Sequence, residues 1–423
     1  MATSEAESTQ SAERPFSKLS WAQRRLLALL GVPSLGLAFA VTVTSTYVPV
    51  LVEKVSGPVM VGVLIGGEGF FGIFVPLLVG GRVDRHRTVA GRLGWLLAGA
   101  AVLAASVTAV GVLGVLKAGL WGFGIGLTLL YLGYYTYLAP YWALYPDLVP
   151  SDQSGRSRSA EGVFRVTGVG LALIGGGVLL TVSPGLPFFI AAVLVVAVTG
   201  ILTFGLRRRR ADRVERRGDE RRAFGDIRQL LTEPGILRLV IANSLWNFAL
   251  AALRAFVVLF FTAGLGKPSS FVSAIIFPLV AVGIAIAAPL SGWLADKFGH
   301  IRLMTAALAL YGGTMWIPGV IQYSWVAVLI PIVSAGAATV MTLPLSVLMR
   351  LLPEDKHGAA SGLFGLSRGV GGTLGPIVAG AAILAMRSVL PGTHGYGAMW
   401  FVGSAALLVS IPVLRGLRGD ERL

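Results

Sequence analysis

The sequence predicts an all-α integral membrane protein with twelve transmembrane helices, and three observations predict it. Of 423 residues, 55% are hydrophobic and only 13% are charged, which leaves too few charges to cover a water-soluble protein of this size. Apolar stretches of about 20 residues, each long enough to cross the hydrocarbon layer as a helix, recur along the whole chain. The alternating pattern that a transmembrane barrel requires is absent, and helices satisfy their own backbone hydrogen bonds in lipid.

The expected spans fall into two groups of six on either side of a polar segment. The run RRRRADRVERRGDERR lies in the only long polar segment inside the chain. It either rests on anionic lipid as an amphipathic element or is a solvated charge block that sets topology. We therefore expect a tail at 1–25, a six-helix bundle at 26–206, a linker at 207–235, a second bundle at 236–414 and a tail at 415–423. The individual spans are 26–51, 58–79, 93–116, 119–145, 160–182, 187–206, 236–263, 270–294, 302–321, 325–349, 360–385 and 397–414.

The net charge of +15 is distributed unevenly between the two sides of the membrane. Of 35 Lys and Arg residues, 30 lie in the tails, in the even-numbered loops or in the adjoining helical turns. The odd-numbered loops hold only Lys54, Lys117, Lys267 and Arg387. By the positive-inside rule, both termini are expected to be cytoplasmic in a multi-pass protein of the plasma membrane. The basic charge is therefore a topology signal, and no nucleic-acid partner is expected.

Several functional classes find no support in the sequence. The first 25 residues lack the basic-then-apolar pattern of a signal peptide, and cysteine is absent, so disulfides and thiolate metal sites are excluded. The four histidines lie in or near loops without metal-ligand spacing. No nucleophile motif and no phosphate-binding glycine loop is present. We therefore expect no enzyme activity, no cofactor and no metal.

Two loop motifs occur twice, at nearly the same distance along the chain. The loop after the second span reads VGGRVDRHRT, and the loop after the eighth reads SGWLADKFGH. The segment SDQSGRSRSAEGVFRVTG after the fourth span matches EDKHGAASGLFGLSRGVG after the tenth. Such doubling indicates that the chain consists of two related halves. The matches align Gly80 with Gly292, Asp84 with Asp296, Arg85 with Lys297 and Arg165 with Arg368, and the second copy of the first motif adds Gly299.

The segment GWLADKFGHIR resembles the Gly-x-Leu-Ala-Asp-basic-x-Gly-basic-basic loop of the major facilitator superfamily, with His300 and Ile301 where basic residues are usual. The first copy, GGRVDRHRT, departs further, because Arg82 replaces a small or apolar residue and the second glycine is missing. With the six-plus-six arrangement, the resemblance covers nearly the whole chain. It implies a secondary transporter, expected to be a monomer, in which two bundles rock about a central site lined chiefly by the first, fourth, seventh and tenth spans.

Shorter matches bear on the branch of the superfamily. PLLVGGRVDR and YPDLVPSDQSGRSRSAEGVF resemble the sugar and cation symporters that include sucrose transporters. Two features typical of proton-coupled drug antiporters, an arginine in the fourth span and a Gly-Pro pair in the fifth, are missing. The resemblance therefore favours uptake over efflux.

The repeated charges are candidates for a cytoplasmic gate. In the geometry that the resemblance implies, the second span faces the eleventh and the fifth faces the eighth. We expect two latches, Asp84 with Arg368 and Asp296 with Arg165, that close the cytoplasmic side while the outer side is open. Two alternatives stay open: Glu161 lies four residues before Arg165 and can pair with it, and the charges can simply mark the membrane boundary.

Glu68 and Arg254 are the two charged residues placed deepest in the predicted spans. A buried charge is costly, so Glu68 should be protonated or face water or a cation, and Arg254 should face water, an acid or a ligand. Glu68 is the candidate for proton coupling. The alternatives are a carboxylic acid that hydrogen-bonds to a neighbouring helix and a shift in register that places Glu68 at the cavity wall.

Polar and aromatic side chains on the four cavity-lining spans are candidates for binding the solute. Aromatic rings with hydroxyl groups suit a sugar, although the same residues suit core packing and the membrane interface. Small hydroxyl side chains also serve close helix packing. The candidates are Thr42, Ser45 and Thr46 in the first span, Tyr131, Tyr134, Tyr135 and Trp142 in the fourth, Asn243, Trp246, Asn247 and Arg254 in the seventh, and Thr339, Thr342 and Ser346 in the tenth.

The sequence thus predicts a proton-coupled secondary transporter for a small polar solute such as a sugar or glycoside. Its expected partners are that solute, a proton and membrane lipid. Two alternatives remain: an antiporter that exports drugs or metabolites, and a transport-inactive receptor or scaffold.

Overall fold

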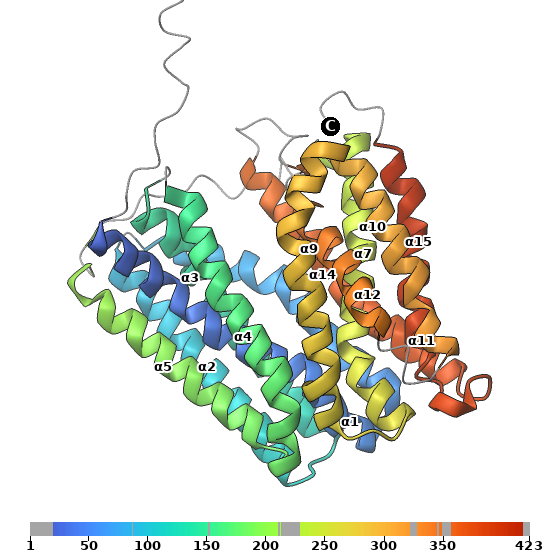
Figure 1. The fold of residues 1–423 in the computed structure, drawn as a ribbon. Helices are drawn as coiled ribbons and strands as arrows, with labels where there is room; N and C mark the ends of the chain where they lie inside the picture. Colours follow the sequence, from blue (N-terminus) through green and yellow to red (C-terminus); the bar gives the residue numbers. More distant parts are fainter. Residues whose placement is uncertain are drawn as a thin grey trace, which may run out of the picture.

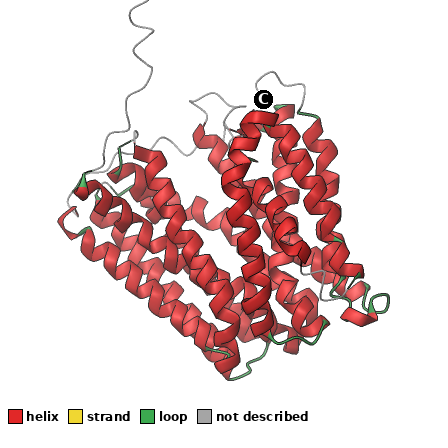
Figure 2. Cartoon of the chain, in the orientation of Figure 1, coloured by secondary structure: helices red, strands yellow, loops and turns green. Residues whose placement is uncertain are grey.

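The computed structural model describes residues 20–86, 88–150, 153–209, 212, 229–321, 328–344, 347–348 and 357–417. Within these ranges the protein is helical and has no strand (Figure 2). The predicted fold class is therefore confirmed. Each long helix satisfies its own backbone hydrogen bonds, and its predominantly apolar side chains allow it to lie in lipid.

The first helix, α1 (Trp21–Val83), is 63 residues long and runs through the first two predicted spans. It begins with a capping box, in which the Ser20 hydroxyl accepts from the Gln23 backbone N–H and the Gln23 side chain accepts from that of Ser20. The two spans meet at Gly57, whose φ of 73° and ψ of 177° belong to a region open essentially only to glycine. Gly57 therefore allows the chain to turn between the first and second spans without a long loop.

The remaining helices follow the predicted spans to within a few residues, apart from the tenth span. The first half continues with α2 (Val89–Val115), α3 (Leu120–Leu148), α4 (Ser154–Val182), α5 (Leu186–Gly205) and the 3-10 turn η2 (Arg207–Arg209). The second half contains α7 (Pro234–Leu259), the π-helical η3 (Phe260–Gly264), α8 (Ser269–Phe271), η4 (Val272–Ile276), α9 (Phe277–Phe298), α10 (His300–Met315), α11 (Ile317–Val320), α12 (Ile330–Thr342), α14 (His357–Ala385), η7 (Pro391–Thr393) and α15 (Ala398–Arg415).

Among the described residues, nine helices are long and apolar enough to cross a membrane, and α1 contains two of the predicted spans. The helix α3 is not among the nine, and α12 is apolar but shorter than the others. By length and composition alone, the structure therefore gives fewer spans than the predicted twelve. The predicted number is reached when α3 and α12 are counted as spans.

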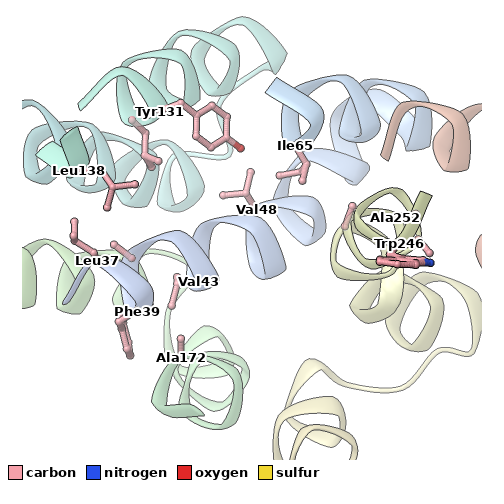
Figure 3. Close-up of a cluster of buried hydrophobic side chains, with 14 of the residues drawn as sticks. Leu37, Phe39, Val43, Val48, Ile65, Tyr131, Leu138, Ala172, Trp246 and Ala252 are labelled. Atoms are coloured by element: carbon pink, nitrogen blue, oxygen red, sulfur yellow. The ribbon is translucent and has the colours of Figure 1, made fainter. Parts of the chain in front are cut away.

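The helices form two bundles that lie side by side (Figure 1). The first bundle contains α1 to α5, with the second part of α1 packed on α3, and the second contains α7 to α15. The described part of the chain begins at α1 and ends just after α15, at the same end of the molecule (Figure 1). We call this end the terminal end and the other the distal end. A continuous core of buried apolar side chains extends through both bundles, and Figure 3 shows part of it between α1, α3, α4 and α7.

The second part of α1 packs against α14 in the other bundle. A Cβ atom added to Gly66 would lie 2.6 Å from the carbonyl oxygen of Thr373, and one added to Gly69 would lie 2.5 Å from the Thr373 nitrogen. Only residues without side chains allow two helix backbones to approach so closely. These glycines therefore set the distance between α1 and α14.

Further contacts between the bundles gather at the distal end. The Tyr47 hydroxyl hydrogen-bonds to that of Ser273 over 2.9 Å, and the Ser269 hydroxyl donates to the Gly177 carbonyl over 3.3 Å. The Tyr396 hydroxyl donates to Glu53 Oε1 over 2.9 Å. These polar contacts join α1 and α4 to the second bundle where α4 ends and where α1 turns at Gly57.

Candidate functional site

Glu68 and Arg254, 186 positions apart in the chain, form an ion pair between the two bundles. Glu68 lies in the second part of α1, and Arg254 lies in α7. Arg254 Nη2 is 3.3 Å from Glu68 Oε2 and 3.4 Å from Oε1. The Glu68 side chain is 10% exposed and that of Arg254 is 32% exposed. The sequence predicts that Glu68 and Arg254 each need a polar or charged partner, but it does not predict that they pair with each other.

The ion pair leaves part of the arginine unsatisfied. Charge-assisted hydrogen bonds between nitrogen and a carboxylate are usually about 2.7–2.9 Å long, and arginine often engages a carboxylate through two nitrogens. Here a single nitrogen makes both contacts, at 3.3 and 3.4 Å. The Arg254 Nε atom is buried and has no hydrogen-bond partner among the described residues. Arg254 therefore retains donor capacity that Glu68 does not use.

Three tyrosines of α3 lie within the electrostatic reach of this pair. Glu68 and Arg254 both act on the hydroxyls of Tyr131, Tyr134 and Tyr135. The Tyr131 side chain is directed from α3 toward the part of α1 that carries Ile65 (Figure 3). Its hydroxyl is buried and has no hydrogen-bond partner among the described residues.

Glycines of α1 make room for these tyrosines. A Cβ atom at Gly67 would lie 3.5 Å from the Tyr131 ring, and one at Gly72 would lie 2.7 Å from the Tyr135 hydroxyl. The rings of Tyr134 and Tyr135 meet edge to face, with their centroids 4.9 Å apart. An ion pair, a buried free hydroxyl and two edge-to-face rings together can bind a small molecule that carries both polar and ring groups.

The polar residues of the first span and of α7 mainly bond within their own half. The hydroxyl of Ser45 donates to the Val41 carbonyl, one helical turn earlier. Asn243 donates to Ser367 over 2.6 Å, and Trp246, which is fully buried, donates to Ser410 over 2.8 Å. These two bonds tie α7 to α14 and α15. Thr42 and Thr46 are also buried, and the Thr46 hydroxyl has no hydrogen-bond partner in the described ranges. Asn247 donates to the Asn243 carbonyl over 2.8 Å.

The other predicted cavity residues are more scattered. Trp142 is 46% exposed on α3. Thr339 is buried in α12, and Thr342 is exposed at the end of α12, where its hydroxyl lies 3.0 Å from that of Ser291. Ser346 lies outside the described residues. The structure thus gathers Glu68, Arg254 and the three tyrosines of α3, and these residues define the candidate site.

At the terminal end, Asp84 pairs with a residue that sequence reasoning missed. Arg92 of α2, whose side chain is fully buried, lies 3.6 Å from Asp84 and forms a close ion pair with Asp147 of α3. Arg92 was expected only as one of the charges that set the topology. Asp147 occurs in the quoted segment YPDL, but it has no counterpart in the repeats. The common position of all three residues at one membrane boundary was the signal that could have indicated the cluster.

The remaining charges of the predicted gate lie along the same end. Arg165 Nε is 3.3 Å from Glu161 Oε1, which is the intrahelical pairing that the four-residue spacing allows. Glu161 also accepts from Ser34 of α1 over 3.0 Å, so it ties α4 to α1. Arg368 is exposed on α14. Asp84 contacts Arg92 here, and the latches between Asp84 and Arg368 and between Asp296 and Arg165 stay predictions.

The doubled loops themselves have a simple local structure. Gly80 lies in the last turns of α1, and Gly292, Asp296 and Lys297 lie in the last turns of α9. The Lys297 ammonium rests over the ring of Trp293, 5.3 Å from its centroid. The helix α9 ends at Gly299, whose φ of 86° suits only glycine, while Arg85 is exposed just after α1.

Comparison with known proteins agrees with this fold. The family model for the Major Facilitator Superfamily matches residues 147–376, which is more than half of the chain. The chain is 34% identical over 101 residues to the multidrug export protein EmrB of Haemophilus influenzae, covering 23% of this chain and 20% of EmrB. It is 26% identical over 270 residues to the probable transporter SCO4007 of Streptomyces coelicolor, covering 63% of this chain and 60% of that protein. The matches thus span less than two thirds of the length of either curated relative.

Solved structures share the fold at low sequence identity. A bacterial homologue of the human lysosomal transporter Spinster, inward-facing and unoccupied, has a TM-score of 0.72 at 16% identity, covering 94% of this chain and 96% of that one. The nucleoside transporter NupG has a TM-score of 0.69 at 15% identity, covering 94% of this chain and 99% of that one. The two-bundle architecture and the family match agree, so the chain belongs to the Major Facilitator Superfamily, a family of membrane transporters rather than enzymes.

Proposed function

We propose that this protein is a secondary transporter that moves a small polar solute across the membrane by alternating access, and that Glu68 couples this movement to protons. The observation that carries the proposal is the ion pair between Glu68 and Arg254, which joins α1 of one bundle to α7 of the other. A charge pair at this position responds to two events at once, namely the arrival of a proton and the relative motion of the bundles.

The coupling follows from electrostatics. Two unit charges about 4 Å apart attract by about 4 kcal/mol at an effective dielectric constant of about 20, and by less where water screens them. Arg254 is 32% exposed, so water screens the pair and the attraction is weaker than this value. When Glu68 takes up a proton, this attraction is lost, and the two bundles are freer to separate at this point. Proton uptake therefore favours a different arrangement of the bundles.

The distribution of contacts supports a state that is open at the terminal end. Polar bonds between the bundles gather at the distal end, through Tyr47, Ser269 and Tyr396. At the terminal end, Asp84 and Arg165 pair within their own bundle. Given the positive-inside rule, we propose that the terminal end faces the cytoplasm across the plasma membrane. The predicted latches would then form when that end closes.

The solute is proposed to bind beside Arg254 and the α3 tyrosines. A sugar or glycoside remains one candidate class, because hydroxyl groups and aromatic rings lie together there. A specific observation favours a second candidate function, export of amphipathic compounds: the local match to a protein named as a multidrug export protein. Both functions use the same site and differ in the direction of solute movement.

Purified protein in liposomes that enclose a pH-sensitive dye would test the proposal. Pools of sugars, glycosides, organic carboxylates and amphipathic cations would be added to either side, and solute-dependent proton movement would be recorded. We expect Glu68→Gln to abolish proton movement while solute counterflow continues, because the neutral amide cannot take up a proton.

The matched control is Glu233→Gln, since Glu233 precedes α7 and makes no side-chain cap hydrogen bond. It should behave as the wild type. Proton-driven accumulation that persists in Glu68→Gln would exclude the coupling role. Absence of flux and counterflow with every pool would instead favour the receptor or scaffold.

A further inference from the structure

We infer that the solute is an organic monoanion whose carboxylate replaces Glu68 as the partner of Arg254 while Glu68 takes up the proton. The inference rests on the proposed function and names the substrate class of the same site. It stands on three observations: the unused donors of Arg254, the positive charge around the site, and the unpaired hydroxyl of Tyr131.

The first observation is the incomplete pairing of Arg254. Glu68 reaches one nitrogen of the guanidinium, at 3.3 and 3.4 Å, and Nε is buried without a hydrogen-bond partner among the described residues. A mobile carboxylate can approach Nε and Nη2 side by side, in the two-bond geometry that arginine forms best. A substrate anion can therefore satisfy Arg254 better than the tethered Glu68 does.

The second observation is an excess of positive charge. Glu68 acts on the Tyr134 hydroxyl from α1, and three cations act on it as well: Arg254 from α7, Arg368 from α14 and Arg165 from α4. The charge of Arg165 is offset by its contact with Glu161. Once Glu68 is neutral, the remaining charges of this set favour an anion near Arg254.

The third observation is the buried hydroxyl of Tyr131, which has no hydrogen-bond partner among the described residues. A buried polar group without a partner is costly, and a bound ligand can supply one. Tyr131 is only 2% exposed, and its ring centroid lies 6.1 Å from that of Phe71. With the edge-to-face rings of Tyr134 and Tyr135, this places aromatic surface within the electrostatic reach of Arg254. The favoured ligand is thus a carboxylate attached to a ring.

The exchange conserves charge within the site. In the empty site, Glu68 and Arg254 neutralise each other. In the loaded site, the proton on Glu68 and the anion on Arg254 restore the same balance. On release, Glu68 returns to Arg254 and gives up its proton, so one monoanion and one proton move together as a neutral pair.

Thermal unfolding of the purified full-length chain with matched ligand pairs would test this inference. The pairs are benzoate with benzamide and glucuronate with methyl glucoside, each titrated at pH 6 and at pH 8. We expect a carboxylate to raise the unfolding temperature and its neutral counterpart to leave it unchanged. The carboxylate should also act at a concentration about tenfold lower at pH 6, because its binding is linked to protonation.

Variants at the pair sharpen the test. Glu68→Gln removes the competing carboxylate, so it should bind the same carboxylate more tightly than the wild type at pH 8 and lose the pH dependence. Arg254→Gln should abolish the stabilisation. If that variant does not fold, Arg254→Lys, which keeps the charge, would be measured in its place. The control is Lys267→Gln, which removes an exposed positive charge from the loop before α8 and should bind as the wild type does.

Three results would overturn the inference: equal stabilisation by the neutral counterparts, weaker carboxylate binding in Glu68→Gln, or no stabilisation of that variant by any carboxylate. Flux experiments separate this failure from that of the proposed function. Proton movement that a neutral solute drives and that depends on Glu68 would support the proposed transport function and rule out an anion as the substrate. Carboxylate binding with the expected dependence on pH and on Glu68, but without any flux, would support the anion site and rule out transport.

Discussion

At the scale of single residues, the charged side chains in the membrane region are held by specific partners. Arg92 is the extreme case, because its side chain is fully buried and lies between Asp84 and Asp147. A buried cation of this kind is costly unless acids neutralise it. Arg254 differs, because it is 32% exposed and contacts Glu68 through one nitrogen. The buried contact of Arg92 with Asp147 suits a fixed structural junction, whereas the contact of Arg254 with Glu68 suits a site whose partner can change.

This difference makes Arg92 a test of stability. We expect Arg92→Leu to lower the free energy of unfolding by about 3–5 kcal/mol, because Asp147, whose side chain is 5% exposed, loses its cation. Equilibrium unfolding in mixed detergent would measure the change. The control Arg82→Ala should leave the midpoint unchanged, since Arg82 is exposed and, within the described part of the chain, donates only to the Leu78 carbonyl of its own helix. A wild-type midpoint for Arg92→Leu would show that the cluster adds no stability.

At the scale of elements, glycines decide which helices can touch. The positive φ of Gly57 divides α1, and Gly66 and Gly69 allow its second part to approach α14. Gly67 and Gly72 leave space for Tyr131 and Tyr135. One helix therefore carries the contact between the bundles on one side and the tyrosine site on another.

Adding a methyl group at the helix crossing should disturb it. We expect Gly66→Ala to destabilise the protein by about 1–3 kcal/mol, because the new Cβ would lie 2.6 Å from the Thr373 carbonyl oxygen and force α1 and α14 apart. Thermal unfolding followed by circular dichroism would measure it. Gly94→Ala on α2 is the matched control, since its Cβ would meet nothing within 4 Å and the helix should gain stability. Equal effects of the two substitutions would contradict a close crossing.

At the scale of the whole molecule, the distal end holds the bundles together. The bond from Tyr396 to Glu53 links the loop before α15 to α1. Burial, followed by the nearby Glu53 charge, raises the pKa of Tyr396 above its ordinary value. A raised pKa means that the protonated hydroxyl stabilises the fold fully below the ordinary tyrosine pKa of about 10, and that this contribution is lost as pH rises through the higher native value. The bond is therefore present throughout the neutral range.

Loss of this bond should shift the molecule toward closure of the terminal end. The chain has no cysteine, so spin labels can be placed at the terminal end on Arg82→Cys and Phe298→Cys, and at the distal end on Leu116→Cys and Val320→Cys. We expect Tyr396→Phe to increase the population with a shorter terminal distance and a longer distal one. Tyr311→Phe should change neither, because the Tyr311 hydroxyl has no hydrogen-bond partner among the described residues. Unchanged distances in Tyr396→Phe would show that the bond does not restrain the bundles.

The sequence by itself determined the helical membrane fold, the two related halves and most of the helix boundaries. These features depend on local hydrophobicity and on residues such as Gly299, whose backbone conformation is a local property. It also singled out Glu68 and Arg254, because a charge inside an apolar span is costly wherever the helix lies. Only the tertiary structure decided that these two residues meet, that Trp246 bonds to Ser410 and that Arg92 joins two aspartates. Pairing between helices depends on their rotation and crossing, which are set by contacts between residues far apart in the chain and leave no periodic signal in a single sequence.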